Sequence, residues 1–199
     1  MSLTFYGFAK SVVYTIFKPW YRVQAIGVEN IPKEGGVLLC SNHISVIDPI
    51  VVGIMQPRPV HYMAKEELFN IPVFGNIVRK CNAFPVKRGF NDREALRTGL
   101  KLLKDGHVFG LFPEGTRSKT GELGKGLAGA GFFALRTEAQ VVPCAVIGPY
   151  KSLRKLKVVY GKPIDLTEMR QTKASAEQVT EIIMSEIDKL IKEHKKASA

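Results

Sequence analysis

The stretch Val37-Leu38-Leu39-Cys40-Ser41-Asn42-His43-Ile44-Ser45-Val46-Ile47-Asp48-Pro49 holds the pattern that decides the fold. It places His43 and Asp48 five positions apart, between two apolar runs. On a continuous helix the pair would be about 140° apart, and on an extended chain roughly 17 Å apart, so only a turn can bring them together. Asp48 is a good N-cap, and Pro49 suits the first helical position. We therefore expect a buried strand, a tight loop carrying His43, and a helix that begins near Asp48.

The composition is that of an ordinary globular protein with an excess of positive charge. The chain has 199 residues, of which 45% are hydrophobic and 24% charged, and this is long enough for one domain with a substantial core. A net charge of +11 suggests an anionic partner, which could be nucleic acid, an anionic membrane or a phosphate-bearing substrate. Cys40, Cys81 and Cys144 have no metal-binding spacing and favour a reduced intracellular protein. We expect no metal and no cofactor.

Residues 1–22 differ from the rest of the chain, and we treat 23–199 as the main domain. The apolar part of this segment is too short and too polar for a bilayer span, which needs about 20 apolar residues. Aromatic side chains beside Lys10, Lys18 and Arg22 are typical of a helix that lies in the membrane interface. The alternative is a first helix that simply packs on the core.

Alternating strand-like and helical runs predict an α/β fold with a mixed, largely parallel sheet flanked by helices. Helical periodicity follows Asn91 or Asp92, either of which can cap the helix, and Gly106 ends it. Ser175 and Gln178 form a capping box for a C-terminal helix. Strands are expected at 23–28, 37–40, 60–64, 83–86, 107–112, 141–147 and 156–160, and further helices at 66–69, 73–80 and 132–136.

Three polar loops follow apolar strands: 43–48, 87–89 and 114–118. In parallel α/β sheets the loops at the carboxyl ends of strands converge on one crevice. Such a crevice would hold an imidazole, a carboxylate, several cations and a Gly-Thr-Arg turn. A base beside phosphate-binding groups suggests removal of a proton from a phosphorylated alcohol.

Other chemistries find less support in the sequence. There is no G-x-S-x-G elbow for a nucleophilic serine, and Cys40 ends an apolar run, so we expect it to be buried and inert. The spacing Gly124-x-Gly126-x-x-Gly129 matches a dinucleotide fingerprint but does not directly follow a strand and lacks the acidic residue downstream. His61, His107 and His194 form no constellation and are interpreted as structural.

Four ordered blocks make the chain resemble the glycerolipid acyltransferases, and most closely the 1-acyl-glycerol-3-phosphate acyltransferases. The similarity runs from about Val23 to Gly161, and all four blocks in order are far more specific than the first alone. The blocks are Asn42-His43-x-x-x-x-Asp48, Phe84-Pro85-Val86-Lys87-Arg88-Gly89, Phe112-Pro113-Glu114-Gly115-Thr116-Arg117-Ser118 and Val142-Pro143-Cys144-Ala145.

The resemblance implies transfer of an acyl group from acyl-CoA or acyl-carrier protein to the 2-hydroxyl of lysophosphatidic acid, which gives phosphatidic acid. His43 would be the general base and Asp48 would orient it. The backbone N–H of Gly115 or Thr116, or the side chain of Lys65, would stabilise the oxyanion. Val142–Ala145 would line an acyl groove. The residues assigned to the substrate phosphate and its surroundings are Arg88, Glu114, Gly115, Thr116 and Arg117.

The resemblance also implies a peripheral or monotopic protein on the cytoplasmic face of the cell membrane. Its partners would be lysophosphatidic acid, an acyl thioester and the membrane surface, with acyl-carrier protein as a further candidate and no nucleic acid. Three alternatives stay open: an acyltransferase for glycerol 3-phosphate or another lysophospholipid, a basic nucleic-acid-binding domain, and a lipid-binding homologue without catalysis. The second lacks a recognisable binding motif, and the presence of His43 and Asp48 argues against the third.

Overall fold

Strands and helices alternate along the chain, as the sequence predicts for an α/β protein. The computed structural model describes residues 2–87 and 92–196. The strands are β1 (Gln24–Ile26), β2 (Val37–Ser41), β3 (Val60–Lys65), β4 (Ala83–Val86), β5 (Val108–Leu111), β6 (Gln140–Ile147) and β7 (Lys157–Tyr160). The helices are α1 (Ser2–Trp20), the 3-10 helix η1 (Val28–Asn30), α2 (Asp48–Met55), α3 (Glu66–Phe69), α4 (Phe74–Lys80), α5 (Arg93–Lys104), α6 (Gly129–Leu135), α7 (Thr167–Gln171) and α8 (Ala176–Lys196).

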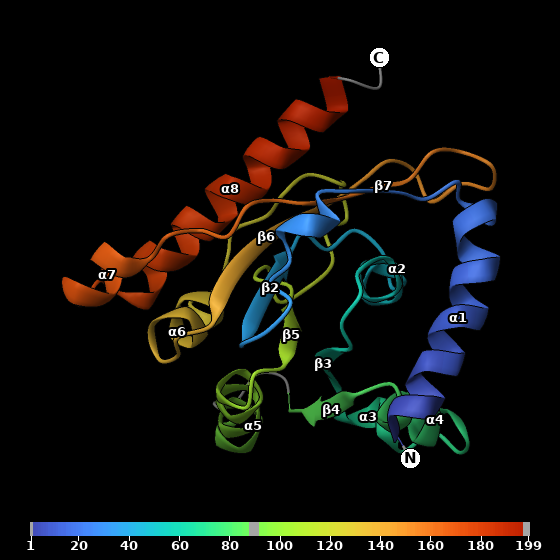
Figure 1. The fold of residues 1–199 in the computed structure, drawn as a ribbon, viewed down its shortest axis with the longest axis horizontal. Coiled ribbons are helices and arrows are strands. Elements are labelled where there is room, and N and C mark those ends of the chain that lie inside the picture. The colour runs from blue at the N-terminus through green and yellow to red at the C-terminus, as the bar shows by residue number, and fades with distance from the viewer. Residues whose placement is uncertain (1, 88–91, 197–199) are drawn as a thin grey trace.

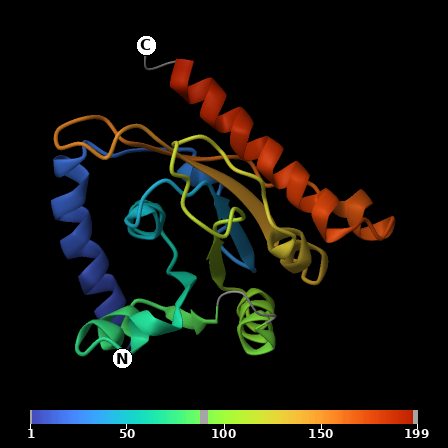
Figure 2. The ribbon, with the colours of Figure 1, turned by 180° about the vertical axis from the view of Figure 1, so that it is seen from behind.

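The strands form one seven-stranded sheet in the order β1-β7-β6-β2-β5-β3-β4 (Figures 1 and 2). β2 to β6 are parallel to one another; at the register of β2, Leu39 pairs with Gly110 of β5 and with Val142 of β6. β7 is antiparallel to β6, and β1 is parallel to β7. The predicted mixed and largely parallel sheet is therefore confirmed, and the carboxyl ends of five strands lie at one edge.

Helices cover both faces of the sheet, and each face has its own apolar core. Successive residues of β2 alternate between them, so that Leu38 and Cys40 face one core and Val37 and Leu39 the other. α5, α6 and α8 pack on the first face. α2 and the C-terminal end of α1 pack on the second, and α1 and α8 lie on opposite sides of the sheet in Figure 1. All five residues of β2 are buried, which explains its uninterrupted apolar sequence.

Helix ends follow the predicted capping chemistry with one exception. The Asp92 carboxylate accepts a hydrogen bond from the N–H of Ala95, and Ser175 and Gln178 exchange the two bonds of a capping box. The exception is Asp48, predicted as an N-cap, which is instead the first helical residue after an N-cap at Ile47. Its carboxylate faces back into the preceding loop, where it binds groups of that loop.

The expectation that Val142–Ala145 packs against an acyl groove stays a prediction. This block lies within β6, between β2 and β7, and its side chains are buried in the two cores. Pro143 has no N–H to donate, yet its carbonyl accepts a hydrogen bond from the N–H of Gly161 at 2.8 Å. The block therefore forms part of the central sheet beneath the site.

Candidate functional site

The loop between β2 and α2 carries the candidate base, and the structure brings His43 and Asp48 together as predicted. The Nδ1 atom of His43 is 2.8 Å from Oδ2 of Asp48. The same carboxylate oxygen accepts the backbone N–H groups of Ile44 and Ser45, each at 2.7 Å, and Oδ1 accepts the hydroxyl of Tyr150. Four donors thus converge on a side chain with no solvent exposure.

This arrangement determines which nitrogen of the imidazole is available for chemistry. An ionised carboxylate can only accept, so Nδ1 of His43 carries the proton that it donates to Asp48. In the neutral imidazole Nε2 is then the unprotonated nitrogen, which is the form a general base requires. The His43 side chain is 13% exposed, so it is not sealed off from solvent. Stacking on the ring of Phe112, with centroids 4.1 Å apart, fixes its orientation further.

Glu114 joins the His43 loop to the loop after β5. Its Oε1 accepts the N–H of His43 and its Oε2 accepts the N–H of Gly124, both at 2.8 Å. The carbonyl of His43 in turn accepts the N–H of Ser118 at 2.7 Å. Because Glu114 is buried and both of its oxygens bind backbone groups, the structure gives it a role in positioning the loops. Its predicted contact with substrate stays a prediction.

The Gly-Thr-Arg turn begins at Gly115, whose conformation and N–H hydrogen bond shape the turn. Gly115 has φ +67, and a Cβ there would lie 2.6 Å from a methyl of Leu127, so this turn requires glycine. The N–H of Gly115 donates to the carbonyl of Phe112 at 2.9 Å and closes the turn. It is therefore engaged, which leaves Thr116 and Lys65 as the predicted oxyanion donors.

A hollow of about 360 Å³ opens beside this turn. Thr116, Arg117 and Ser118 line it, and so does Lys125 from the following segment, which the sequence did not single out. Glu114 and Glu122 line it as well, so two carboxylates lie beside the two cations. Glu114 is engaged by the N–H groups of His43 and Gly124, and Arg117 with the neighbouring hydroxyls offers donors that suit a phosphate group. Arg88, the other predicted phosphate ligand, lies outside the described residues.

The two lysines near this edge of the sheet lie at the ends of neighbouring strands. Lys65 ends β3 and is exposed. Lys87 follows β4, and its Nζ is 3.8 Å from the carboxylate of Glu66. Both strand ends lie at the same edge of the sheet as His43, as the loop spacing predicted.

Tyr150, like Lys125, is a residue of this site that the sequence did not indicate. It lies beyond β6, 102 positions from Asp48. Burial and the adjacent Asp48 carboxylate raise the pKa of Tyr150, so the phenol stays protonated and remains a donor. Its ring packs edge-on against Tyr21, with centroids 5.7 Å apart, and Tyr21 follows α1.

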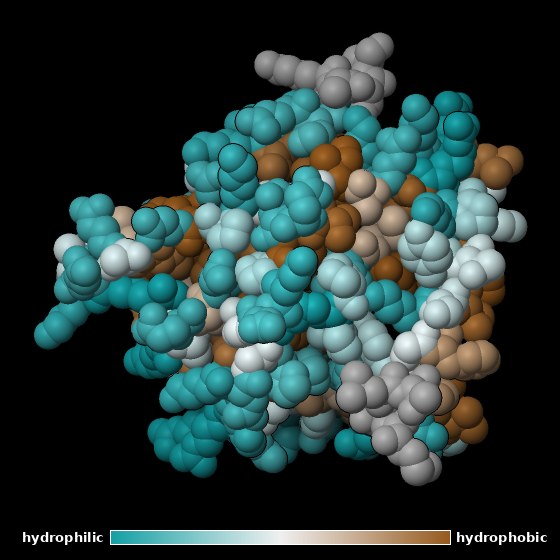
Figure 3. All heavy atoms as spheres, viewed as in Figure 1, coloured by the Kyte–Doolittle hydropathy of each residue, from teal (hydrophilic) through white to brown (hydrophobic). Residues whose placement is uncertain are grey.

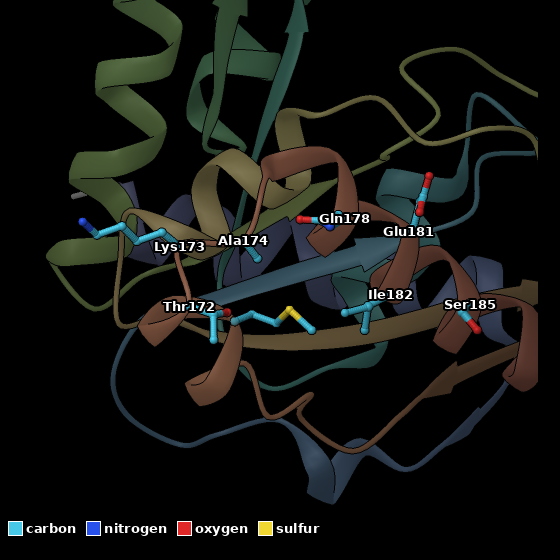
Figure 4. Close-up of a pocket in the computed structure, with 8 residues that line it drawn as sticks. Thr172, Lys173, Ala174, Gln178, Glu181, Ile182 and Ser185 are labelled. Atoms are coloured by element: carbon cyan, nitrogen blue, oxygen red, sulfur yellow. The ribbon is translucent and has the colours of Figure 1, made fainter.

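The remaining reactive groups lie elsewhere. Cys40 and Cys144 are buried, as expected for Cys40, and burial raises the pKa of Cys144 to about 12, so neither thiol can act as a nucleophile. Among residues 2–87 and 92–196, no cluster of three or more His, Cys, Asp or Glu side chains could hold a metal. A larger hollow, of about 710 Å³, lies between α7 and α8, with Lys173 and Glu181 at its rim (Figure 4), and shares no residue with the site.

An oriented, carboxylate-bound histidine beside a hollow that Arg117 and Lys125 line is typical of a class of enzymes that activate a hydroxyl group or a water molecule for reaction. Comparison with known proteins narrows the class. Residues 22–147 match the family model described as Acyltransferase, and the chain belongs to that family.

Individual relatives agree with this assignment. The chain is 33% identical over 165 residues to the 1-acyl-sn-glycerol-3-phosphate acyltransferase of Bacillus subtilis, an alignment that covers 80% of this chain and 82% of that protein. A chloroplastic 1-acyl-sn-glycerol-3-phosphate acyltransferase of Arabidopsis thaliana is 33% identical over 67% of this chain and 38% of its own. The crystal structure of the 1-acyl-sn-glycerophosphate acyltransferase PlsC from Thermotoga maritima superposes with a TM-score of 0.76 and 26% identity, covering 98% of this chain and 79% of that one.

Proposed function

We propose that the protein transfers a fatty acyl group from a thioester, acyl-CoA or acyl-carrier protein, to the sn-2 hydroxyl of 1-acyl-glycerol-3-phosphate, producing phosphatidic acid. The observation that carries the proposal is the His43–Asp48 pair, held at 2.8 Å beside the hollow that Arg117 and Lys125 line. The relatives from Bacillus subtilis and Thermotoga maritima, named for this activity, support the choice of substrate.

In the proposed reaction Nε2 of His43 removes the proton of the substrate hydroxyl as its oxygen attacks the thioester carbonyl. Asp48 stabilises the imidazolium that forms. The N–H of Thr116 or the ammonium of Lys65 stabilises the oxyanion of the tetrahedral intermediate. The C–S bond then breaks, and the imidazolium returns its proton to the departing thiolate. The ester and the free thiol are the products.

The hollow beside the Gly-Thr-Arg turn is the proposed phosphate site. Arg117 can bind a phosphate with two parallel hydrogen bonds, and Lys125 adds a point charge. The sequence predicts Arg88 as a further side chain that binds the phosphate. A site of this kind would also accept glycerol 3-phosphate or another lysophospholipid, so the acceptor must be tested directly.

We also propose that the protein works on the cytoplasmic face of the cell membrane and that α1 contacts the bilayer. None of the helices in the described part of the chain is long and apolar enough to span a membrane. α1 nevertheless exposes Phe8, Val12, Ile16 and Trp20, and hydrophobic side chains gather along this side of the molecule in Figure 3. Such a face suits a helix lying in the interface. Lys10, in contrast, turns inward and binds the carbonyl of Gln56.

The test is an acceptor assay that follows release of free thiol from a long-chain acyl thioester. We expect turnover with 1-acyl-glycerol-3-phosphate and a loss of roughly 10²–10⁴-fold in His43→Ala, the usual contribution of a general base. Faster turnover with glycerol 3-phosphate would reassign the acceptor. Turnover that survives His43→Ala would refute the mechanism.

The contribution of α1 is better tested by substitution than by removing residues 1–20. Phe17 and Tyr21 pack against the second core, so a deletion would uncover apolar surface. Phe8→Ser and Trp20→Ser change only exposed positions. We expect both variants to sediment less with anionic vesicles, and unchanged sedimentation would contradict a membrane role for this helix.

A further inference from the structure

Outside α1, exposed apolar side chains gather where α3 turns into α4. We call residues 70–77 the α3–α4 corner. Four large hydrophobic residues project from it with exposed fractions of 47% for Ile71, 73% for Val73, 45% for Phe74 and 43% for Ile77. The site does not use these side chains, and their number within eight positions is more than isolated surface residues would give.

The backbone of the corner is strained at its most exposed residue. Val73 has φ 64 and ψ −53, and the N–H of Phe74 donates to the carbonyl of Pro72 at 2.7 Å. This is a γ-turn of the rare kind with positive φ, and a β-branched residue is the least suited to it. Strain of this type costs on the order of 1–3 kcal/mol and persists only when the surroundings impose it.

Packing beneath the corner imposes this conformation. The N–H of Gly75 donates to the carbonyl of Ile71 at 2.9 Å. The Cα of Gly75 lies so close to Phe69 that a Cβ would meet the Phe69 carbonyl oxygen at 2.2 Å. Phe69 itself is buried. The turn is therefore packed closely against Phe69 on its inner side, while Val73 is 73% exposed on its outer side.

Basic and aromatic side chains connect the corner to α1. The Nζ of Lys80 lies 5.2 Å from the ring centroid of Phe5 in α1, and Arg79 lies over the ring of Phe69. Figure 1 shows the N-terminal half of α1 beside α4, and Figure 2 shows the same arrangement from behind. The corner thus lies next to the N-terminal half of α1, and cations border it.

From this geometry we propose that the α3–α4 corner is a second membrane contact, which enters the interfacial region of an anionic bilayer beside α1. Apolar side chains would bury in the headgroup boundary while Arg79 and Lys80 meet anionic lipid, at about 1 kcal/mol per cation. The corner begins five positions after Lys65, at the edge of the sheet that carries the site. Two contacts instead of one would fix the orientation of that edge toward the lipid. The inference deepens the proposed function and rests on it for the identity of the substrate.

The chain offers a direct optical test because Trp20 is its only tryptophan. In a Trp20→Phe background, Val73→Trp reports the corner and Ser185→Trp serves as the matched control. Ser185 is an exposed position on α8, across the sheet from α1. With phosphatidylglycerol vesicles carrying brominated acyl chains, we expect a blue shift and quenching at position 73 and neither at position 185. Unchanged emission at position 73 on vesicles that bind the protein would overturn the proposal.

A second experiment uses a variant that lacks the apolar side chains of the corner. The double variant Val73→Ser/Phe74→Ser should bind the same vesicles about tenfold more weakly, since two partly buried side chains are lost. Circular dichroism verifies the fold. Full binding by the folded double variant would also overturn the proposal. So would a dimer of the lipid-free protein, detected by light scattering, whose interface covers the corner. Failure of the proposed function is distinct from these outcomes, because it appears as wild-type protein that binds vesicles without releasing thiol.

Discussion

Tyr150 supplies a single hydrogen bond to the carboxylate that orients the base. We expect Tyr150→Phe to lower kcat roughly tenfold with little change in KM, because the buried Oδ1 of Asp48 loses its donor while the substrate contacts remain. Steady-state thiol release measures both constants. The downfield Nδ1 proton resonance of His43 should shift in the same variant, since its acceptor has changed.

Tyr21→Phe is the control for Tyr150→Phe. Tyr21 packs against the Tyr150 ring, and its replacement by phenylalanine keeps that ring contact. If both variants lose activity equally and the His43 resonance stays in place, the role of Tyr150 is packing alone.

Glu114 offers a second prediction at the scale of one side chain. In Glu114→Gln the amide NH₂ must face one of two N–H donors, from His43 or Gly124, so a buried acceptor is lost. We expect a destabilisation of about 1–3 kcal/mol in urea unfolding, together with reduced kcat. If Glu114 contacts the substrate instead, the KM for the acceptor changes and the stability does not.

The sequence could predict the His43–Asp48 pair but not everything that surrounds it. His43 and Asp48 lie five positions apart, and local chain geometry sufficed to bring them together in a turn. Tyr150 reaches the same carboxylate from 102 positions away, and no spacing pattern records such a contact. Glu114 belonged to a recognised block, yet its partners are backbone groups of two other loops. Residue type alone does not reveal such hydrogen-bond partners.

At the scale of elements, periodicity and capping residues predicted most helices and strands. α7 was missed because five residues carry little periodic signal. The antiparallel pairing of β7 with β6 was also missed, since strand direction follows from the path of the connection and not from strand composition. Asp48 was misplaced by one position because its carboxylate binds the loop before the helix.

Glycine substitutions test how α3, α4 and α1 are packed. Gly75→Ala places a Cβ 2.2 Å from the backbone oxygen of Phe69, so α4 must shift, and we expect a loss of about 1–3 kcal/mol. Gly7→Ala is the matched control, because Gly7 lies within α1 with nothing within 4 Å of the new Cβ. Alanine there should stabilise by roughly 0.5–1 kcal/mol. Thermal unfolding of both variants measures the difference, and equal melting temperatures would contradict the packing described.

On the scale of the whole molecule, the two faces of the sheet differ in how their helices are exposed. α5, α6 and α8 close one core, whereas α1 and α2 close the other and leave apolar side chains outside. The site lies at the carboxyl edge between these faces. Tyr21 and Tyr150 connect the end of α1 with the Asp48 carboxylate through one ring contact and one hydrogen bond. A short chain of contacts therefore joins the proposed membrane face to Asp48 and His43.

The net charge of +11 adds a long-range attraction to anionic membranes that can be separated from apolar contact. Raising KCl from about 0.1 M to about 1 M shortens the screening length from roughly 10 Å to roughly 3 Å. We expect sedimentation with phosphatidylglycerol vesicles to weaken over this range without disappearing, because apolar burial by α1 does not depend on salt. Phosphatidylcholine vesicles, which lack net charge, should show weaker and nearly salt-independent binding. Complete loss of binding at high salt would mean that charge alone holds the protein at the surface, and that the exposed side chains of α1 and the α3–α4 corner do not enter the bilayer.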